Sequence, residues 1–270
     1  MFLAALWFFI WGLLWAIYFI TDGFDIGVGI LLPFISRNEI DKRVMYNSTG
    51  PLWDGNEVWL ITAGGVTFAA FPEMYAAMFS SFYTALFLLL VALIIRGVSF
   101  EFRSKAEASG YKKLCDIFQF LGSGLIAILL GVAFANIFRG LPIIDGVNKS
   151  GLFYLLNPYG LCGGALFLVL FMVHGAIWLA IRTEGRLQQR AVKTANLLWP
   201  VELIAAVIFL VYSWFETDLY KNYLRYPVLF VLVGITVSAL LLTGIFVKRR
   251  QFWKGWFCSA VVLAGVTFFG

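Results

Sequence analysis

Long apolar stretches alternate with short polar ones along the whole chain. The apolar stretches are rich in Leu, Ile, Val and Phe, and most charged residues lie between them. A helix needs about 20 apolar residues to cross the hydrocarbon core of a bilayer, so the pattern predicts a series of membrane-spanning helices. The eight predicted helices cover Leu6 to Ser36, Glu57 to Phe71, Tyr75 to Val98, Cys115 to Phe138, Tyr159 to Ile181, Ala195 to Phe215, Tyr226 to Val247, and Phe257 onward.

Two of these stretches are shorter than the others. The second crosses a membrane only if Leu52 to Trp59, which contains Asp54 and Glu57, forms its first turns. The eighth reaches Gly270 after too few residues to cross, and no polar flank follows that would anchor it. We therefore expect a truncated eighth span.

The composition supports a membrane location. The chain is 61% hydrophobic and 13% charged, whereas soluble domains are about half apolar and about a quarter charged. We expect an all-α, polytopic membrane protein in which residues 1–270 form a single transmembrane domain. The cysteines lie far apart without CxxC spacing, so no zinc site or disulfide framework is indicated.

The loops predict an orientation. Loops after odd-numbered stretches are rich in Lys and Arg, whereas loops after even-numbered stretches carry few. Because basic loops stay on the cytoplasmic side, the odd loops are predicted to be cytoplasmic and the N-terminus outside. The net charge of +5 follows from this topology, and we expect no nucleic-acid partner.

Two carboxylates, Asp22 and Asp25, lie inside the first apolar stretch. An ionised side chain in hydrocarbon is costly, so such residues face a cavity or a partner and are candidates for function. They are three positions apart and therefore share a helix face. Asp25 lies roughly 13 Å inside Phe34 at helical rise, which is near the middle of the membrane.

Two further acids, Asp54 and Glu57, lie at the inner end of the second predicted helix, again three apart. A series of carboxylates from the cytoplasmic surface inward can conduct protons, because desolvated acids accept and release protons near neutral pH. We therefore predict a proton path through Asp54, Glu57 and Asp25.

Structural interpretations of these acids stay open. Asp54 and Asn56 could cap the second helix, since their side chains accept hydrogen bonds from free backbone N–H groups. Asp25 could join two helices as a hydrogen-bonded carboxylic acid, and Asp22 could cap a helix break at Gly23.

Basic residues and the lone histidine complete the candidate groups. Arg96, Glu101 and Arg103 cluster at the inner end of the third helix, where snorkelling and ion pairing are the ordinary interpretation. His174 is the one histidine. A haem clamped by two side chains is therefore not expected, although His174 as an axial ligand shared with another subunit stays open beside a buried, hydrogen-bonded imidazole. Phosphate-binding loops and nucleophile elbows are missing from the sequence.

Three segments carry a resemblance to a known family. They are Thr21 to Gly29 (TDGFDIGVG), Trp53 to Gly65 (WDGNEVWLITAGG) and Arg96 to Lys105 (RGVSFEFRSK). With these segments the sequence closely resembles subunit II of the cytochrome bd-type quinol oxidases. The resemblance is densest over the first 105 residues and rests on hydropathy alone beyond Arg186.

The resemblance implies a heterodimer in a bacterial or archaeal cytoplasmic (inner) membrane. Subunit I would hold haem b and haem d, oxidise quinol and reduce O₂ to water, whereas this chain alone would bind no cofactor and hold no complete catalytic site. In the family, the acids at Asp25 and Asp54 are implicated in a path for cytoplasmic protons. A quinone in this subunit, membrane lipid and a small single-helix accessory subunit are further expected partners.

The resemblance also implies a fold of two four-helix bundles with an extra peripheral helix. The printed sequence ends inside the eighth span, so the ninth helix is expected to be absent. Trp53, Asp22, Arg96 and Glu101 lie in or beside the matching motifs and are candidate subunit-contact residues.

Two other functions are weighed against this one. A proton-coupled secondary transporter would use the same carboxylates to bind a substrate or coupling ion, but no second copy of the acidic motif marks an internal repeat. A purely structural membrane anchor leaves Asp25 in hydrocarbon without a task.

Overall fold

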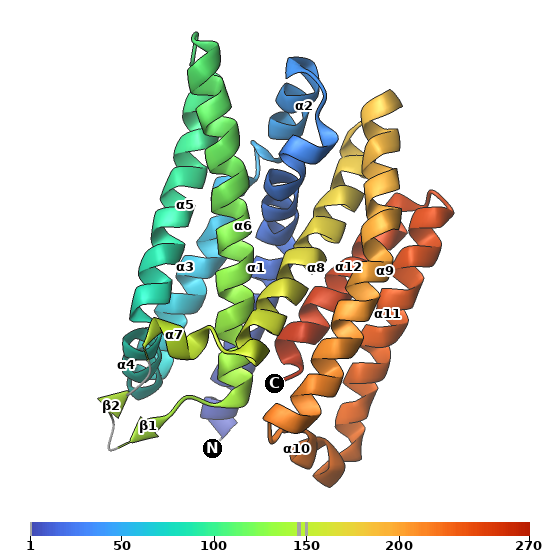
Figure 1. The fold of residues 1–270 in the computed structure, drawn as a ribbon. Helices are drawn as coiled ribbons and strands as arrows, with labels where there is room; N and C mark the ends of the chain where they lie inside the picture. The colour runs from blue at the N-terminus through green and yellow to red at the C-terminus, as the bar shows by residue number, and fades with distance from the viewer. Residues whose placement is uncertain (1, 145–146, 149–150) are drawn as a thin grey trace.

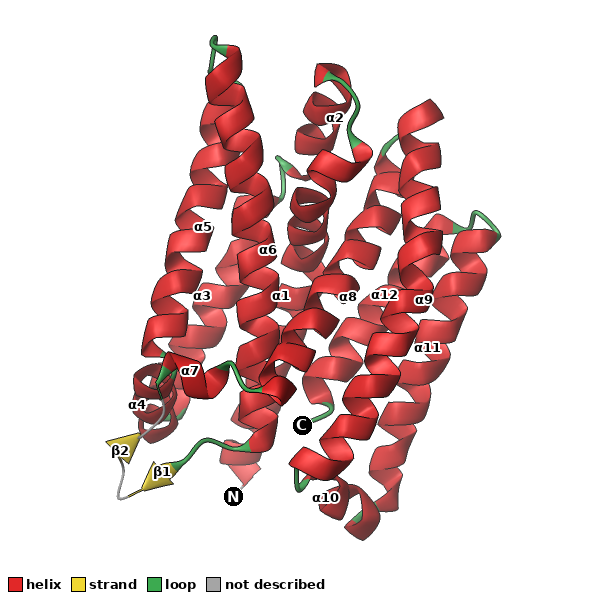
Figure 2. Cartoon of the chain, viewed as in Figure 1, coloured by secondary structure: helices red, strands yellow, loops and turns green. Residues whose placement is uncertain are grey.

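The protein is almost entirely helical in the computed structural model, which describes residues 2–144, 147–148 and 151–270. Figure 2 shows helices throughout, with one short antiparallel strand pair. The predicted all-α fold is thus confirmed. In chain order the elements are α1 (Phe2–Ile35), α2 (Glu39–Thr49), α3 (Trp53–Ala70), α4 (Pro72–Ser81), α5 (Tyr83–Arg103), α6 (Ser109–Arg139), β1 (Ile143–Ile144), β2 (Val147–Asn148), α7 (Leu152–Leu155), α8 (Pro158–Arg182), α9 (Gly185–Glu216), α10 (Leu219–Arg225), the 3₁₀ turn η1 (Pro227–Leu229), α11 (Phe230–Lys248) and α12 (Phe252–Phe268).

The long helices form two groups of four that lie side by side (Figure 1). In the first group, α1 packs on α3 and α6, and α5 packs on α6. In the second, α8 packs on α9 and α12, and α11 packs on α12 and α9. Helices α1 and α6 also pack on α8, which joins the groups. This arrangement confirms the two four-helix bundles.

Close backbone approach holds the two bundles together. A Cβ atom placed on Gly27 of α1 would overlap the carbonyl of Phe171 and would lie 3.1 Å from Cα of Gly175, both in α8. Small residues let helices approach in this way in membranes, where packing replaces the hydrophobic effect between helices. Aromatic rings fill the space beyond the crossing, with Phe19 edge-on to Phe134 and Phe167 at 4.9 and 5.1 Å between ring centroids.

Among the residues that the structure describes, six helices are long and apolar enough to cross a membrane. Helix α3 is 18 residues long with acids in its first turns, and α12 is 17 residues long. The structure differs from the sequence prediction at several helix boundaries, including the following three. The third stretch is divided at Phe82 into α4 and α5, α9 extends back to Gly185, and α12 begins at Phe252 rather than Phe257.

Two of these differences have a physical reason. Helix hydrogen bonds continue past the membrane surface, so α9 adds polar turns that hydropathy does not register. Gly185 adopts a φ of 62° between α8 and α9, a left-handed conformation that favours glycine and lets the chain reverse tightly. At Phe82 the helix turns directly after Ser80 and Ser81, whose hydroxyl groups donate to the carbonyl of Ala77. Two serines inside an otherwise apolar stretch do not divide it in a hydropathy pattern.

Candidate functional site

The two acids of the first stretch are fully buried in an unbroken α1. Asp22 and Asp25 each have an exposed fraction of 0%. The helix continues from Phe2 to Ile35, so the predicted cap of a break at Gly23 is wrong. The two side chains instead meet different neighbouring helices.

Asp22 forms a buried ion pair with Arg96 of α5. Arg96 Nη2 donates to Asp22 Oδ1 at 2.6 Å and Nη1 donates to Oδ2 at 3.2 Å. Nη1 also donates to Oε1 of Glu57, in the first turns of α3, at 2.8 Å. The guanidinium fork matches two acceptor groups at once, so this one side chain links α1, α3 and α5.

The ion pair corrects the expectations for Arg96 and Asp22. Both side chains are completely buried within this chain, so neither can be a direct subunit contact. Arg96 does not snorkel to the surface either, because its charge is compensated inside. Trp53 stacks on Phe100 at 5.3 Å and is half-buried, whereas Glu101 is exposed; for these two a subunit contact stays a prediction.

Asp25 is bound by an amide. Asn56 Nδ2 donates to Asp25 Oδ2 at 2.7 Å and to the carbonyl of Thr21 at 3.1 Å. The other oxygen, Oδ1, is buried and has no hydrogen-bond partner among the described residues. Asn56 therefore does not cap α3, and it is the residue through which α3 reaches Asp25.

Asp54 lies at the exposed start of α3. Its Oδ1 accepts a hydrogen bond from the N–H of Gly55 at 2.8 Å, and it forms no direct contact with Asp25. The N-cap position of α3 is Leu52, whose side chain makes no cap hydrogen bond. Asp54 is therefore not the N-cap residue, but its carboxylate does accept a free N–H of the first turn, as the capping interpretation expected. Asp54 and Glu57 are one turn apart, with Glu57 on the side of Arg96.

The electrostatic balance of the buried cluster is uneven. One cation, Arg96, faces three acids: Asp22, Glu57 and Asp25. The charges of Arg96 and Asp22 compensate each other in their ion pair, and 21% of the Glu57 side chain is exposed. An isolated charge away from water is expensive and such groups take up a proton instead. The arrangement therefore suits Asp25 for holding and releasing a proton.

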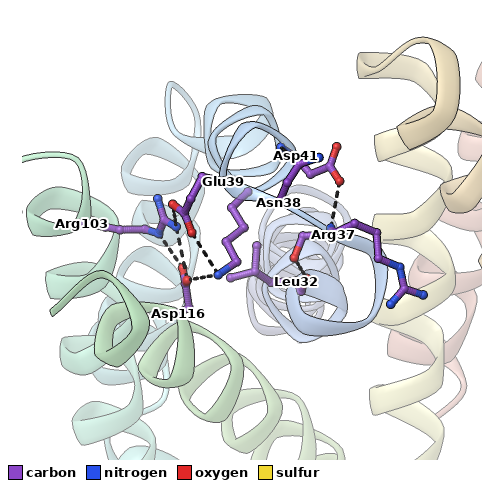
Figure 3. A network of polar contacts seen from close by, with 9 residues as sticks. Leu32, Arg37, Asn38, Glu39, Asp41, Arg103 and Asp116 are labelled. Carbon is purple, nitrogen blue, oxygen red and sulfur yellow. Dashed lines mark hydrogen bonds and ion pairs between the residues drawn. The ribbon is translucent and has the colours of Figure 1, made fainter. Parts of the chain in front are cut away.

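A second charged group ties α2 to the rest of the first bundle (Figure 3). We call Glu39, Lys42, Arg103 and Asp116 the α2 clamp. Arg103 of α5 donates to Asp116 of α6 and, at 3.0 Å, to Glu39 of α2. Lys42 Nζ lies 2.9 Å from Asp116 and 3.3 Å from Glu39. Two cations and two anions thus alternate across three helices.

The clamp shifts the pKa values of its α2 members. Hydrogen bonding to Asp116, outweighing burial, raises the pKa of Lys42. Partial burial alone would raise the pKa of Glu39, but hydrogen bonds from Arg103 and Lys42 outweigh it and the pKa falls below the ordinary value. A depressed acid pKa stabilises the folded state above the unfolded pKa, and this contribution is lost as the pH falls through the folded one.

Replacing Asp116 with asparagine should loosen α2. The substitution removes the negative charge that Arg103 and Lys42 share and one of the two acceptor oxygens, and charged hydrogen bonds of this kind contribute about 1.5 to 3 kcal/mol. We expect the amide hydrogens of α2 to exchange about tenfold faster, measured by hydrogen–deuterium exchange with mass spectrometry. The matched control is Lys105→Gln, which removes an exposed contact at 3.9 Å from Glu101 and should leave α2 unchanged. Equal exchange in both variants would contradict the clamp.

Both ring nitrogens of His174 have hydrogen-bond partners on neighbouring helices. Its Nδ1 lies 3.0 Å from the hydroxyl of Ser259 in α12, and its Nε2 lies 3.0 Å from the carbonyl of Ile20 in α1. An axial bond to a metal would have to displace one of these partners. The site does not fit an iron ligand, and the imidazole instead joins three helices.

One buried acid was missed by the sequence analysis. Glu202 of α9 is 0% exposed, and neither carboxylate oxygen has a hydrogen-bond partner among the described residues. The signal was present, because Glu202 is a lone acid inside the stretch Ala195 to Phe215. It lies outside any motif, so nothing drew attention to it.

Known proteins are similar to this chain in sequence and in fold. A family model described as cytochrome bd terminal oxidase subunit II matches residues 3–270. Over 252 residues the chain is 37% identical to cytochrome bd ubiquinol oxidase subunit 2 of Bacillus subtilis (strain 168), which covers 93% of this chain and 73% of the relative. It is 40% identical over 223 residues to cytochrome bd-I ubiquinol oxidase subunit 2 of Escherichia coli (strain K12), covering 81% of this chain and 59% of the relative.

A solved structure shows the same fold. The bd oxidase from Geobacillus thermodenitrificans superposes with a TM-score of 0.80 at 16% sequence identity, over 99% of this chain and 84% of that chain. At this identity the likeness concerns the arrangement of helices alone.

Proposed function

Because the chain belongs to the cytochrome bd terminal oxidase subunit II family, we propose that it conducts protons through the membrane toward its partner, subunit I. Membership makes the chain a component of an oxidoreductase complex and a multi-pass protein of a bacterial membrane. Family membership favours this function over the proton-coupled secondary transporter that the sequence also left open. The relatives are named as ubiquinol oxidases, and we extend this to oxidation of a quinol coupled to reduction of O₂ to water.

The observation that carries the proposal is the half-bound carboxyl group of Asp25. Asn56 holds one oxygen in place, whereas the other has no partner among the described residues. A carboxylate with a free oxygen can take a proton from a water molecule on one side and release it on another. No bond other than O–H forms or breaks in this exchange, and Asp25 returns to its starting state.

Arg96 and its two partners position the path. Their contacts fix α1, α3 and α5 at the depth of Asp25, and the excess of acid over base attracts protons. In this proposal Glu57 passes protons from the surface, because it contacts Arg96 on one side and is partly exposed on the other. Asp54 lies one turn nearer the surface and collects them.

The proposed orientation places the α2 end of the bundles in the cytoplasm. It is supported by the basic residues in the loops at that end, including those after α5, α8 and α11. Protons then travel from Asp54 inward, and the N-terminus of α1 lies on the outer side. The membrane is proposed to be the bacterial cytoplasmic membrane.

The scaffolding role is proposed for the outer face of α3. Val58, Ile61 and Phe68 are 53%, 73% and 62% exposed and lie on one side of the helix that also carries Asp54. Subunit I seated there would receive protons directly, with Trp53 and Glu101 at its edge. Haems held by subunit I would supply the electron transfer. An accessory subunit and a quinone bound to this chain stay predictions of the family.

Replacing Asp25 with asparagine tests the proton path. The amide keeps the size and the contact to Asn56 but cannot carry a proton, so quinol-driven O₂ uptake by the purified complex should fall at least about tenfold. Asp54→Asn should cause a smaller loss, because water can reach the exposed start of α3.

The matched control is Glu202→Gln, which neutralises an equally buried acid in the other bundle. It should retain normal turnover. Unchanged turnover in Asp25→Asn with unchanged haem content would refute the path while leaving the family membership intact.

A further inference from the structure

Polar atoms line the contact between α1, α5 and α6. We define the seam as Gly29 of α1, Arg96 of α5, and Gln119 and Ser123 of α6, closed at the α2 end by Tyr46. Four of its atoms are buried and have no hydrogen-bond partner in the described part of the chain: Tyr46 Oη, Gln119 Oε1, Ser123 Oγ and Arg96 Nε. The free oxygen of Asp25 lies one turn before Gly29 on the same face of α1.

These groups follow one another along the seam. Gln119 and Ser123 are four apart on α6 and therefore share a face. A Cβ atom on Gly29 would overlap Ser123 Oγ and would lie 2.9 Å from Gln119 Nε2, so both side chains lie against the backbone of α1. Between these two residues on α6, Gly122 packs on α5, where an added Cβ would lie 2.9 Å from the carbonyl oxygen of Ala92 and 3.3 Å from Cβ of Arg96.

The outer end of the seam opens toward the α2 clamp. Tyr46, Thr49 and Gln119 supply the polar side of a small cavity that Val28, Leu32, Met45 and Phe100 also line. It leaves about 10 Å³ for the centre of a water molecule, room for one water at most. Arg103 of the clamp lies over the ring of Tyr46, 4.9 Å from its centroid. The clamp has two cations and two anions, so it presents no net charge to an approaching proton.

The free-energy cost of burying unpaired polar atoms indicates what hydrogen-bonds to these four atoms. A buried polar atom without a partner costs about 1 to 3 kcal/mol, and the cost is higher in a membrane, where no bulk water is near. Native proteins pair nearly all such atoms, and buried water serves where side chains do not. Four such atoms along one helix contact suit buried water.

We propose that the seam holds ordered water and gives protons a second cytoplasmic route to the Asp22, Asp25 and Arg96 group, parallel to the route over Asp54. The inference rests on the proposed proton function of Asp25. Each water accepts a proton on one side and donates another onward, so no water is consumed. The net negative charge of Arg96 with Asp22 and Glu57 attracts the proton at the inner end.

Two variants close the seam without touching the Asp25 carboxyl group. Gln119→Leu removes the polar group at similar size, and Gly29→Ala fills the space beside Ser123. Their controls are Thr243→Val, which removes a buried hydroxyl bound within α11, and Gly124→Ala, where an added Cβ meets nothing within 4 Å. Each variant is made alone and together with Asp54→Asn, and O₂ uptake by the intact complex is measured.

If the two routes run in parallel, blocking both should lower turnover by more than the product of the two single losses. Either seam variant alone should lower turnover less than about threefold, because protons still pass Asp54, whereas each combination with Asp54→Asn should lose about tenfold or more beyond the product of the single losses. For the control variants, the combined loss of turnover should equal the product of the single losses. If the combined loss of turnover were equal to or smaller than the product of the two single losses, the second route would be overturned. Failure of the proposed function would appear separately, as normal turnover in Asp25→Asn.

A second measurement does not depend on turnover. A density map of the whole complex, at a resolution that shows its other waters, should contain water between Gln119 and Ser123 and lose it in Gln119→Leu. A dry seam in the unmodified complex would overturn the inference.

Discussion

Replacing Arg96 with leucine should prevent the folded complex from accumulating. The substitution leaves Asp22 fully buried without its cation, and removing one partner of a buried ion pair typically costs about 3 to 5 kcal/mol. That is a large share of the net stability of a protein domain. We expect a loss of monodisperse complex in size-exclusion chromatography and a clear fall in the thermal unfolding temperature of what remains.

A second substitution separates charge from packing. Combining Arg96→Met with Asp22→Leu removes both members of the pair, and replacing buried pairs by apolar side chains is often neutral or stabilising. The double variant should therefore recover much of the yield. Glu57, which is partly exposed, can keep its charge by contact with water. If the double variant were no better than Arg96→Leu, the uncompensated Asp22 would not be the cause of the loss.

Arg96→Lys tests the geometry of the fork. Lysine keeps the charge but offers a single ammonium group, which cannot donate to both oxygens of Asp22 and to Glu57 from a rigid plane. We expect an intermediate unfolding temperature. A lysine variant as stable as the original would show that the charge alone matters.

Sequence reasoning found the helices because the bilayer imposes their length. About 20 apolar residues are needed whatever the partner helices are, so hydropathy alone located the spans. The boundaries at Phe82 and Gly185 lay beyond this signal, since neither a turn inside an apolar stretch nor a helix continuing into water changes the apolar pattern.

The sequence predicted which residues belong to the site better than it predicted which residues they contact. The burial of Asp22 and Asp25 followed from their position in an apolar stretch. Their partners depend on which helices become neighbours and how each rotates about its axis, which spacing within one helix does not encode. Arg96 therefore appeared as a surface charge and Asn56 as a cap, whereas tertiary packing makes them the partners of Asp22 and Asp25.

Replacing Gly27 with alanine should uncouple the two bundles beside this site. The new methyl group would meet backbone on α8, including the carbonyl of Phe171 and Cα of Gly175, and backbone cannot rotate away as a side chain can. Overpacking of this kind costs about 3 kcal/mol at the upper end of its usual range. Alanine recovers at most about 1 kcal/mol from its better helix propensity. A net loss remains.

The matched control is Gly234→Ala on α11, where an added Cβ meets nothing within 4 Å. There only the propensity gain acts, so the thermal unfolding temperature of the complex should hold or rise slightly, whereas in Gly27→Ala it should fall. Because Gly27 lies between Asp25 and Gly29, turnover should fall with it as α1 shifts. Equal stability of the two variants would mean that α1 and α8 can separate freely, and close backbone contact could then no longer explain how the bundles hold together.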